Sequence, residues 1–425
     1  MLAYSSASLD KDLKSNIEFF EKIKEELNWK NANYLIRSSS MDITSETGNE
    51  YTLVKDGTLT EGRLAYLDIA DGSIYLYSNG YKQNEGELQE YQGDYIITGS
   101  TERNAVKVMD IGTYNITIKD LSIDLSELDP ADVGIKDKAL CAFNANGGPY
   151  SAGIGSGYTG FDAATGVASN IIINSGTITA KGGANGCGIG SSLYGNVNNI
   201  VINGGNIYVD NLNMMRFAIG ATGKLDNLLI NGGTITAIGY TFCGAIGGGE
   251  GSGKITINGG TIFAYAPSNT LYAKCHGIGQ GCEAVEINGG TIVSRSNYCA
   301  GIFSTSGNVK IKGGTIFTIE STIPIGKLGD DGTTLESCIP TDGTNTLYLT
   351  QIQLENVTEK LKVKSLITSD NINYGITDMY TSEGGIVYLY LPKGERTITI
   401  VIGDEKYTGK VITDEENEII ILNEQ

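Results

Sequence analysis

Residue types that carry much of protein chemistry are scarce in this chain. Its 425 residues include one histidine, His276, one tryptophan and six prolines. A zinc site built on histidines is therefore not expected. No apolar run approaches the ~18 residues that a membrane-spanning helix needs, so membrane insertion is not expected either. The Gly-Lys-Ser/Thr ending of a phosphate-binding loop is also missing after the glycine-rich stretch 247–253.

Charge and glycine content exclude further classes of protein. The formal net charge is −19, which argues against nucleic acid or an anionic membrane as the main partner. The same charge favours solubility and leaves Ca²⁺ binding open, and no other cofactor is predicted. The 58 glycines show no Gly-X-Y period, which excludes collagen and favours a turn-rich β architecture.

The seven cysteines do not resemble a disulfide framework. Cys243, Cys275 and Cys299 each lie three residues before the isoleucine of a recurring Gly-Ile-Gly motif, and Cys187 lies two before it. Small residues at a repeated position are typical of a stacked interior, so free thiols that fill the core are expected. Cys275 and Cys282 flank one turn and could in principle oxidise together.

A ten-residue segment, which we call the phrase, recurs six times and organises the chain. Apolar residues alternate on both sides of a Gly-Gly break, which predicts two short strands of period two separated by a sharp turn. The third residues of the copies, at 173, 202, 230, 257, 287 and 311, lie 24 to 30 residues apart. A hairpin would not explain this period, whereas the coils of a parallel β-helix do. The copies are Ile171–Ala180, Ile200–Val209, Leu228–Ala237, Ile255–Ala264, Val285–Ser294 and Val309–Thr318.

Stacking of coils at ~4.8 Å places equivalent residues in columns. The third-position isoleucines then form one interior column. The asparagines before the Gly-Gly break form a ladder in which each amide bonds to the next. The Gly-Ile-Gly motifs between the phrases supply a third wall. The ladder is expected to contain Asn174, Asn203, Asn231, Asn258 and Asn288.

The predicted fold is all-β: a right-handed parallel β-helix with a short N-terminal helix and a small C-terminal β-sandwich. Residues 1–60 are assigned to the N-terminal helix and a cap or docking segment, 61–325 to the β-helix, 326–340 to a linker and 341–425 to an Ig-like sandwich. Segments 67–76 and 116–125 keep the apolar skeleton of the phrase, and 95–98 and 105–108 can supply strands between them.

Residues 9–27 carry apolar side chains at helical spacing. This helix would cover the open end of the stack, or else dock the chain to a larger assembly, including a homotrimer. The first residues, followed by charged Asp10 and Lys11, do not resemble a secretory signal. Either a signal was removed, or the protein is expected to leave the cell by another way, such as lysis.

Residues 64–320, with their Ile-x-Ile-Asn-Gly-Gly-Thr-Ile-x-Ala and Gly-Ile-Gly repeats, resemble the carbohydrate-binding right-handed parallel β-helix proteins on the surface of Gram-positive anaerobes. They also resemble phage tail receptor-binding β-helices. The stretch 347–411, with Tyr388-Leu-Tyr-Leu-Pro-Lys-Gly394, is similar to Cna-B-like β-sandwich modules. The resemblance implies extracellular glycan recognition, on a virion tail or a bacterial cell surface, without a shared catalytic site.

The outer face of the second strand of the phrase is the predicted glycan platform. Aromatic rings stack on pyranose faces and hydroxyls bond sugar edges. The alternative is that threonines and aromatics stand there because they form good strands. The candidate residues are Tyr208, Phe263, Phe317, Thr234, Thr236 and Thr261.

A polysaccharide lyase or glycoside hydrolase is the alternative function. It would need a carboxylate pair, or clustered Asp that holds Ca²⁺ beside a basic catalyst. Only Glu283 and Glu286 are neighbours among the candidates, so no catalytic or metal-binding residue is assigned. The predicted function is non-enzymatic binding of a polysaccharide or cell-wall glycan, as a phage tail fibre or spike protein or a bacterial adhesin. The residues considered for the catalytic site of the alternative enzyme are Asp162, Asp226, Glu250, Glu283, Glu286 and Arg295.

Overall fold

The structure is a computed structural model, and its described part is almost entirely β. Helix in that part is limited to one 3₁₀ turn, η1 (Ile69–Asp71), and none of it is long and apolar enough to cross a membrane. The predicted helix at 9–27 lies outside the described residues. These are 51–55, 58–62, 64–91, 93–101, 103–104, 106–108, 116–123, 145–146, 152–156, 168, 171–173, 177–183, 185–211, 216–239, 243–267, 275–297, 299–319, 321–331, 334–415 and 418–425.

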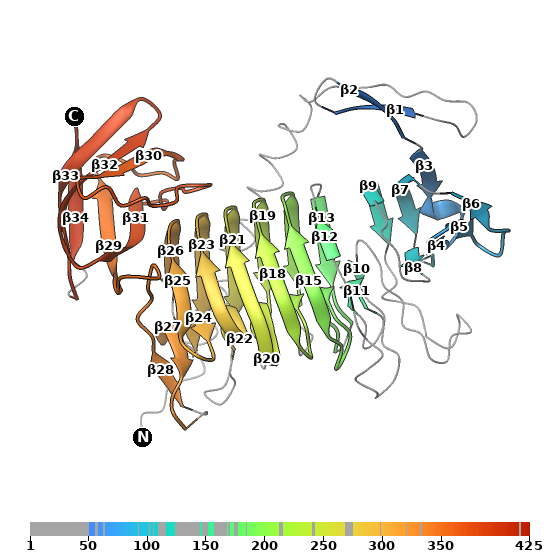
Figure 1. Cartoon of the computed structure of the whole chain (residues 1–425), viewed down its shortest axis with the longest axis horizontal. Coiled ribbons are helices and arrows are strands. Elements are labelled where there is room, and N and C mark those ends of the chain that lie inside the picture. Colours follow the sequence, from blue (N-terminus) through green and yellow to red (C-terminus); the bar gives the residue numbers. More distant parts are fainter. Residues whose placement is uncertain are drawn as a thin grey trace, which may run out of the picture. The chain divides into compact units, whose positions relative to one another are not determined.

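The second strands of the six phrases, together with the earlier strand β10, form a seven-stranded parallel sheet, which we call wall B (Figure 1). Each strand pairs with its equivalent one coil away, so Thr234 lies opposite Thr261 and Thr261 opposite Thr291. The strands are β10 (Ala145–Asn146), β13 (Thr177–Lys181), β16 (Asn206–Asp210), β19 (Thr234–Ile238), β21 (Thr261–Ala266), β23 (Thr291–Ser296) and β26 (Thr315–Ile319).

The first strands of the phrases form wall A, and the Gly-Ile-Gly motifs form wall C. Both walls belong to one twelve-stranded sheet, because β20 (Ile246–Ile257) and β22 (Ile278–Ile287) run through the two. The other strands of wall A are β12 (Ile171–Ile173), β15 (Val197–Ile202), β18 (Leu225–Ile230) and β25 (Asn308–Ile311). Those of wall C are β11 (Ile154–Gly155), β14 (Ile189–Gly190), β17 (Ile219–Gly220), β24 (Ala300–Ser304) and β27 (Ile323–Leu328), followed by β28 (Leu335–Ser337).

The column and the ladder predicted for the interior and the corner are confirmed. The six isoleucines at the third phrase position pair coil to coil and are all buried. Asn231 Nδ2 donates to Asn203 Oδ1 at 2.7 Å, and Asn258 and Asn288 each donate to the preceding asparagine at 2.8 Å. Asn174 lies outside the described residues. The coils are therefore stacked as a parallel β-helix, and the phrases do not form hairpins.

Stacking begins before the clear copies, as the apolar skeleton predicts. The strands β3 (Leu64–Asp68), β7 (Asp94–Thr101) and β9 (Ile116–Ile123) form one parallel sheet. Buried Leu67 and Ile97 lie opposite each other in it. Beside it, β4 (Ile74–Tyr77) pairs in parallel with β8 (Val106–Val108) and carries the excursion β5 (Gly80–Gln83) and β6 (Gln89–Glu90). An antiparallel hairpin, β1 (Tyr51–Lys55) and β2 (Thr58–Gly62), precedes them.

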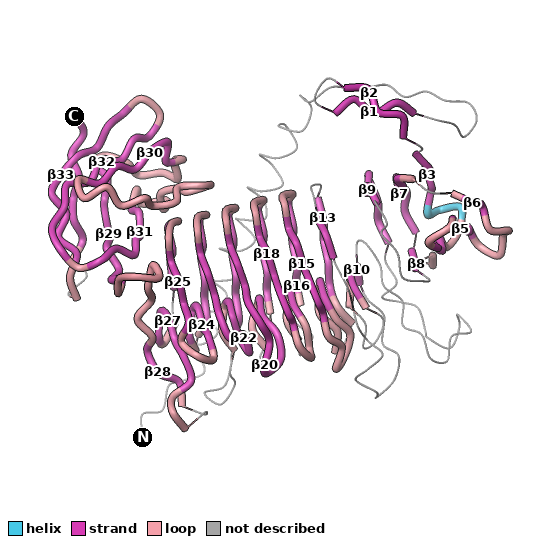
Figure 2. Tube along the Cα trace, in the orientation of Figure 1, coloured by secondary structure: helices cyan, strands magenta, loops and turns pink. Residues whose placement is uncertain are grey.

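The C-terminal module, residues 341–425, consists mainly of β-strands (Figure 2). They form one six-stranded sheet in the order β30-β32-β33-β34-β29-β31, since β34 pairs with both β33 and β29. The sheet has its own core, which includes Ile352, Leu389 and Ile400. The strands are β29 (Leu347–Leu354), β30 (Val363–Thr368), β31 (Ile386–Pro392), β32 (Gly394–Ile402), β33 (Glu405–Thr413) and β34 (Ile419–Glu424).

The six described cysteines are free thiols, and all except Cys338 are buried. Cys187 and Cys243 pack with Phe217, while Cys275 and Cys299 pack with an alanine. Burial raises the pKa of Cys187 to about 12. The prediction that free thiols fill the core is confirmed for the five buried cysteines.

Candidate functional site

The predicted glycan platform occupies two columns on the outer face of wall B. The column next to the asparagine corner runs through Asn206, Thr234 and Thr261, and the second column runs through Tyr208, Thr236 and Phe263. Adjacent parallel strands lie ~4.8 Å apart, so the rings of Tyr208 and Phe263 are anchored ~9.6 Å apart with Thr236 between them. Val293 and Phe317 continue the second column.

The six candidate residues share this face, but their exposure differs. Tyr208, Thr234 and Phe263 are partly exposed. Thr236 and Thr261 are buried, at 3% and 8% exposure. The ring of Phe317 packs against that of Tyr388, with 4.2 Å between the centroids. The surface that a ligand can reach therefore centres on Tyr208, Thr234 and Phe263.

The C-terminal module lies against the last three copies of the phrase. Its residues 374–380, which we call the strap, follow the Gly-Gly corner of these coils. Gly375 N donates to Lys312 O at 3.0 Å, and Gly314 N donates back to Gly375 O at 2.7 Å. One coil earlier, Gly290 N donates to Thr377 O at 2.6 Å. These bonds fix the module to the wall.

Two threonines of the platform column bind the module. The Thr291 hydroxyl donates to Asp378 O at 2.9 Å and accepts from Tyr380 N at 2.8 Å. The Thr315 hydroxyl accepts from Tyr388 N at 2.9 Å. At these two coils the hydroxyls that the phrase places outward serve docking within the chain. Thr234, two coils from Thr291, is partly exposed.

The module also brings cationic and aromatic side chains to the platform, which sequence reasoning missed. Lys360 Nζ lies 5.5 Å from the ring centroid of Phe263 and 5.1 Å from that of Tyr380. Lys362 Nζ lies 5.7 Å from the Tyr380 ring and 3.4 Å from Asp378 Oδ1. Asp378 Oδ2 in turn accepts from Gly260 N at 3.0 Å. The accessible surface is thus a composite of the wall and the module.

Among the described carboxylate candidates, Glu286 is bound by two lysines. It lies on wall A and accepts hydrogen bonds from Lys254 and Lys312, which come from the neighbouring coils. These two bonds lower its pKa to about 2. Each of the two carboxylate oxygens is thus bound by a lysine of a neighbouring coil, so Glu286 connects adjacent coils.

Other potentially reactive groups are also engaged. His276 is buried and stacks on Phe303 at 3.8 Å, and its Nδ1 accepts from Ala300 N at 3.1 Å. Arg295 is buried with its guanidinium 4.9 Å from the ring of Tyr265. Asp162 lies outside the described residues. Within the part of the chain that the structure describes, no three His, Cys, Asp or Glu side chains are grouped to hold a metal ion.

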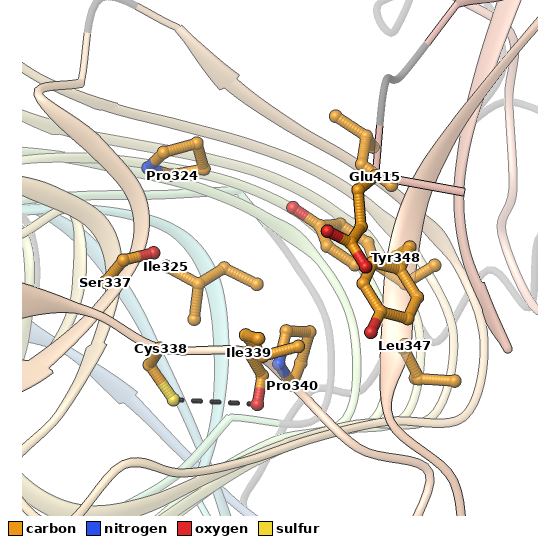
Figure 3. A pocket seen from close by; sticks show the side chains of 11 residues that line it. Pro324, Ile325, Ser337, Cys338, Ile339, Pro340, Leu347, Tyr348 and Glu415 are labelled. Carbon is orange, nitrogen blue, oxygen red and sulfur yellow. Dashed lines mark hydrogen bonds between the residues drawn. The ribbon is translucent and has the colours of Figure 1, made fainter. Parts of the chain in front are cut away.

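A cavity of about 300 Å³ lies where β27, the linker and the module meet (Figure 3). Its lining is mainly apolar and includes Ile325, Pro340 and Leu347. The Cys338 thiol at its wall donates to the carbonyl oxygens of Gly307 and Ile339, and burial raises its pKa. A protonated thiol of this kind is a poor nucleophile. The cavity carries no chemistry that points to catalysis.

Comparison with known proteins adds no relative: no family model, no curated protein and no solved structure matches the chain. The structure alone therefore defines the class. The chain is a parallel β-solenoid protein with a strand-rich module docked on one of its walls.

Proposed function

We propose that this protein binds glycan chains, without acting on them, along the outer face of wall B. The observation that carries the proposal is the pair of partly exposed rings, Tyr208 and Phe263, at the same register position two coils apart. Rings held in this way stack on sugar faces, while the hydroxyl of Thr234 and the amide of Asn206 bond sugar edges.

Rigidity of the wall supports a binding role. Tyr208, Thr234 and Phe263 stand on strands that are paired on both sides, and the asparagine ladder fixes the spacing of the coils. A surface that is already ordered loses little conformational entropy when it binds a long polymer. Repetition along the wall also matches the repetition of a polysaccharide, so several sugars are bound by equivalent positions.

The setting we propose is extracellular, with the protein acting as a phage tail receptor-binding protein or a bacterial surface adhesin. The N-terminal segment would then dock the chain to a larger assembly or a trimer, and the C-terminal sheet would serve as a Cna-B-like sandwich module. A lyase or hydrolase is less well supported, because both carboxylate oxygens of Glu286 are bound by lysines of the neighbouring coils.

A glycan array with the purified protein and three variants tests the proposal. Tyr208→Ala and Phe263→Ala are expected to weaken binding by ~5-fold or more each, taking the ~1–3 kcal/mol of a nucleobase stacked on an aromatic ring as the scale for a sugar ring. Tyr66→Ala removes an exposed tyrosine of β3 and serves as the matched control. Unchanged binding in both wall variants would remove the platform, and release of reducing sugar would favour the enzyme.

A further inference from the structure

Two lysines and a tyrosine of the C-terminal module lie together beside the platform. Lys362 and Tyr380 face each other across an antiparallel bridge, and Thr381 N donates to Leu361 O at 2.9 Å next to it. Lys360, two residues before Lys362, has its ammonium group near the rings of both Tyr380 and Phe263. The module therefore places two positive charges at the edge of the proposed glycan surface.

Both lysines are exposed, and Lys362 also forms an ion pair with a carboxylate. Asp378 accepts from Gly260 N through one oxygen, and its other oxygen lies 3.4 Å from Lys362 Nζ. The Lys362 side chain is 58% exposed. Lys360 contacts the Phe263 and Tyr380 rings through its ammonium group, and cation–π contacts leave an ammonium charged.

The surrounding protein makes this local charge unusual. The chain has 49 acidic and 30 basic residues, so its overall field repels a polyanion rather than attracting one. Affinity for a negatively charged polymer would then have to come from a specific contact. Lys360 and Lys362 are placed to make that contact beside the two rings.

We infer that the C-terminal module forms part of the glycan site, with Lys360 and Lys362 selecting polysaccharides that carry negative charge. The inference rests on the proposed function and names the ligand class for the same site. Sugar rings stack on Tyr208 and Phe263, and an acidic substituent of the chain, whether a carboxylate or a sulfate, contacts the ammonium groups. Lysine suits this role because its ammonium group is a point charge on a flexible side chain and can bind either anion.

Matched polymers test the inference. Hydroxyethyl cellulose and carboxymethyl cellulose share a backbone and differ in charge, as do dextran and dextran sulfate. Titration calorimetry would compare the native protein, the double variant Lys360→Gln/Lys362→Gln and the wall variant Tyr208→Ala. Lys406→Gln/Lys410→Gln, on β33 of the same module, is the control that removes the same charge elsewhere.

An exposed charge pair contributes about threefold in affinity, so the Lys360/Lys362 variant should lose ~10-fold for the charged polymer and less than ~2-fold for the neutral one. The Lys406/Lys410 variant should match the native protein, and Tyr208→Ala should weaken both members of a pair. The ratio of charged to neutral affinity within each pair, compared between the two pairs, identifies the preferred anion.

These measurements distinguish failure of the inference about the lysines from failure of the proposed function. Equal binding of charged and neutral polymers, with Tyr208→Ala still impaired, would overturn the selection by lysines and leave the proposed function in place. Binding of the charged polymer that falls equally in both lysine variants would also overturn it, because the effect would be one of net charge. Binding that is insensitive to Tyr208→Ala would overturn the proposed function itself.

Discussion

A single methyl group at Gly313 should release the strap from the last coil. Gly313 pairs with Gly375 of the strap in a parallel bridge. A Cβ at position 313 would lie 2.4 Å from Gly375 O and 2.5 Å from both Gly375 Cα and Asn288 O. These distances are shorter than Cβ contacts in proteins, and all the atoms met are backbone. Gly313→Ala therefore requires the strap or the corner to move.

The expected loss follows from the bonds at this point. The strap makes three hydrogen bonds here: Gly375 N to Lys312 O, Gly314 N to Gly375 O, and the Tyr374 hydroxyl to Gly314 O. At ~1 kcal/mol each, their loss would cost about 3 kcal/mol. Partial adjustment by overpacking costs about 1–3 kcal/mol. We therefore expect Gly313→Ala to lower the free energy of unfolding by about 1–3 kcal/mol.

Gly232→Ala is the matched control, because Gly232 holds the same phrase position in the third copy. Its added Cβ would lie 3.2 Å from Asn203 O and 3.9 Å from Asp378 Oδ2, so the expected loss of stability is smaller than that of Gly313→Ala. Urea unfolding measures the stability, and hydrogen exchange measures protection of the Gly314 and Gly375 amides. Equal stability and equal exchange in the two variants would refute the docking described here.

Three further predictions concern the coils. Asn258→Ala removes two ladder bonds and Asn288→Ala one, so urea unfolding should show costs of about 2 and about 1 kcal/mol; equal costs would contradict the ladder. Glu286→Gln should cost about 1 kcal/mol or less at pH 7, because both lysines are nearly half exposed. Since the folded pKa of Glu286 is lowered from 4.5 to about 2, this cost should shrink as pH falls from about 5 towards 2, and a cost that persists at pH 2 would exclude the ion pairs as its source. Burial raises the pKa of the Cys187 and Cys282 thiols to about 12, so iodoacetamide at pH 8 should modify them only after unfolding; labelling of the native protein would show that they are accessible.

The β-helix could be predicted from the sequence because its contacts repeat at a fixed period. Ile202 and Ile230 occupy equivalent places in two copies, so the stacking of one on the other follows from the period alone. The same holds for Asn231 and Asn203 in the ladder. Each coil contacts its neighbours, and the pattern of one coil predicts those contacts.

Docking of the C-terminal module could not be predicted in this way. The strap binds backbone N–H and C=O groups at the corners of the coils, which no side-chain pattern encodes. Thr291 and Thr234 hold the same phrase position, yet Thr291 holds the module while Thr234 is partly exposed. Lys360 meets Phe263 only because the module folds back over the wall. The sequence therefore predicts which residues form the proposed glycan platform. It does not predict that the module binds Thr291 or that it brings Lys360 to Phe263.

Footprinting of the glycan-bound protein tests the central claim most directly. Hydroxyl radicals label exposed aromatic side chains, and the best ligand from the array would be compared with buffer alone. Protection is predicted at Tyr208, Phe263 and Tyr380, with Tyr66 and Tyr194 labelled as in the free protein. Unchanged labelling of Tyr208 and Phe263, with protection at Tyr66 or Tyr194, would place the ligand elsewhere and contradict binding along wall B.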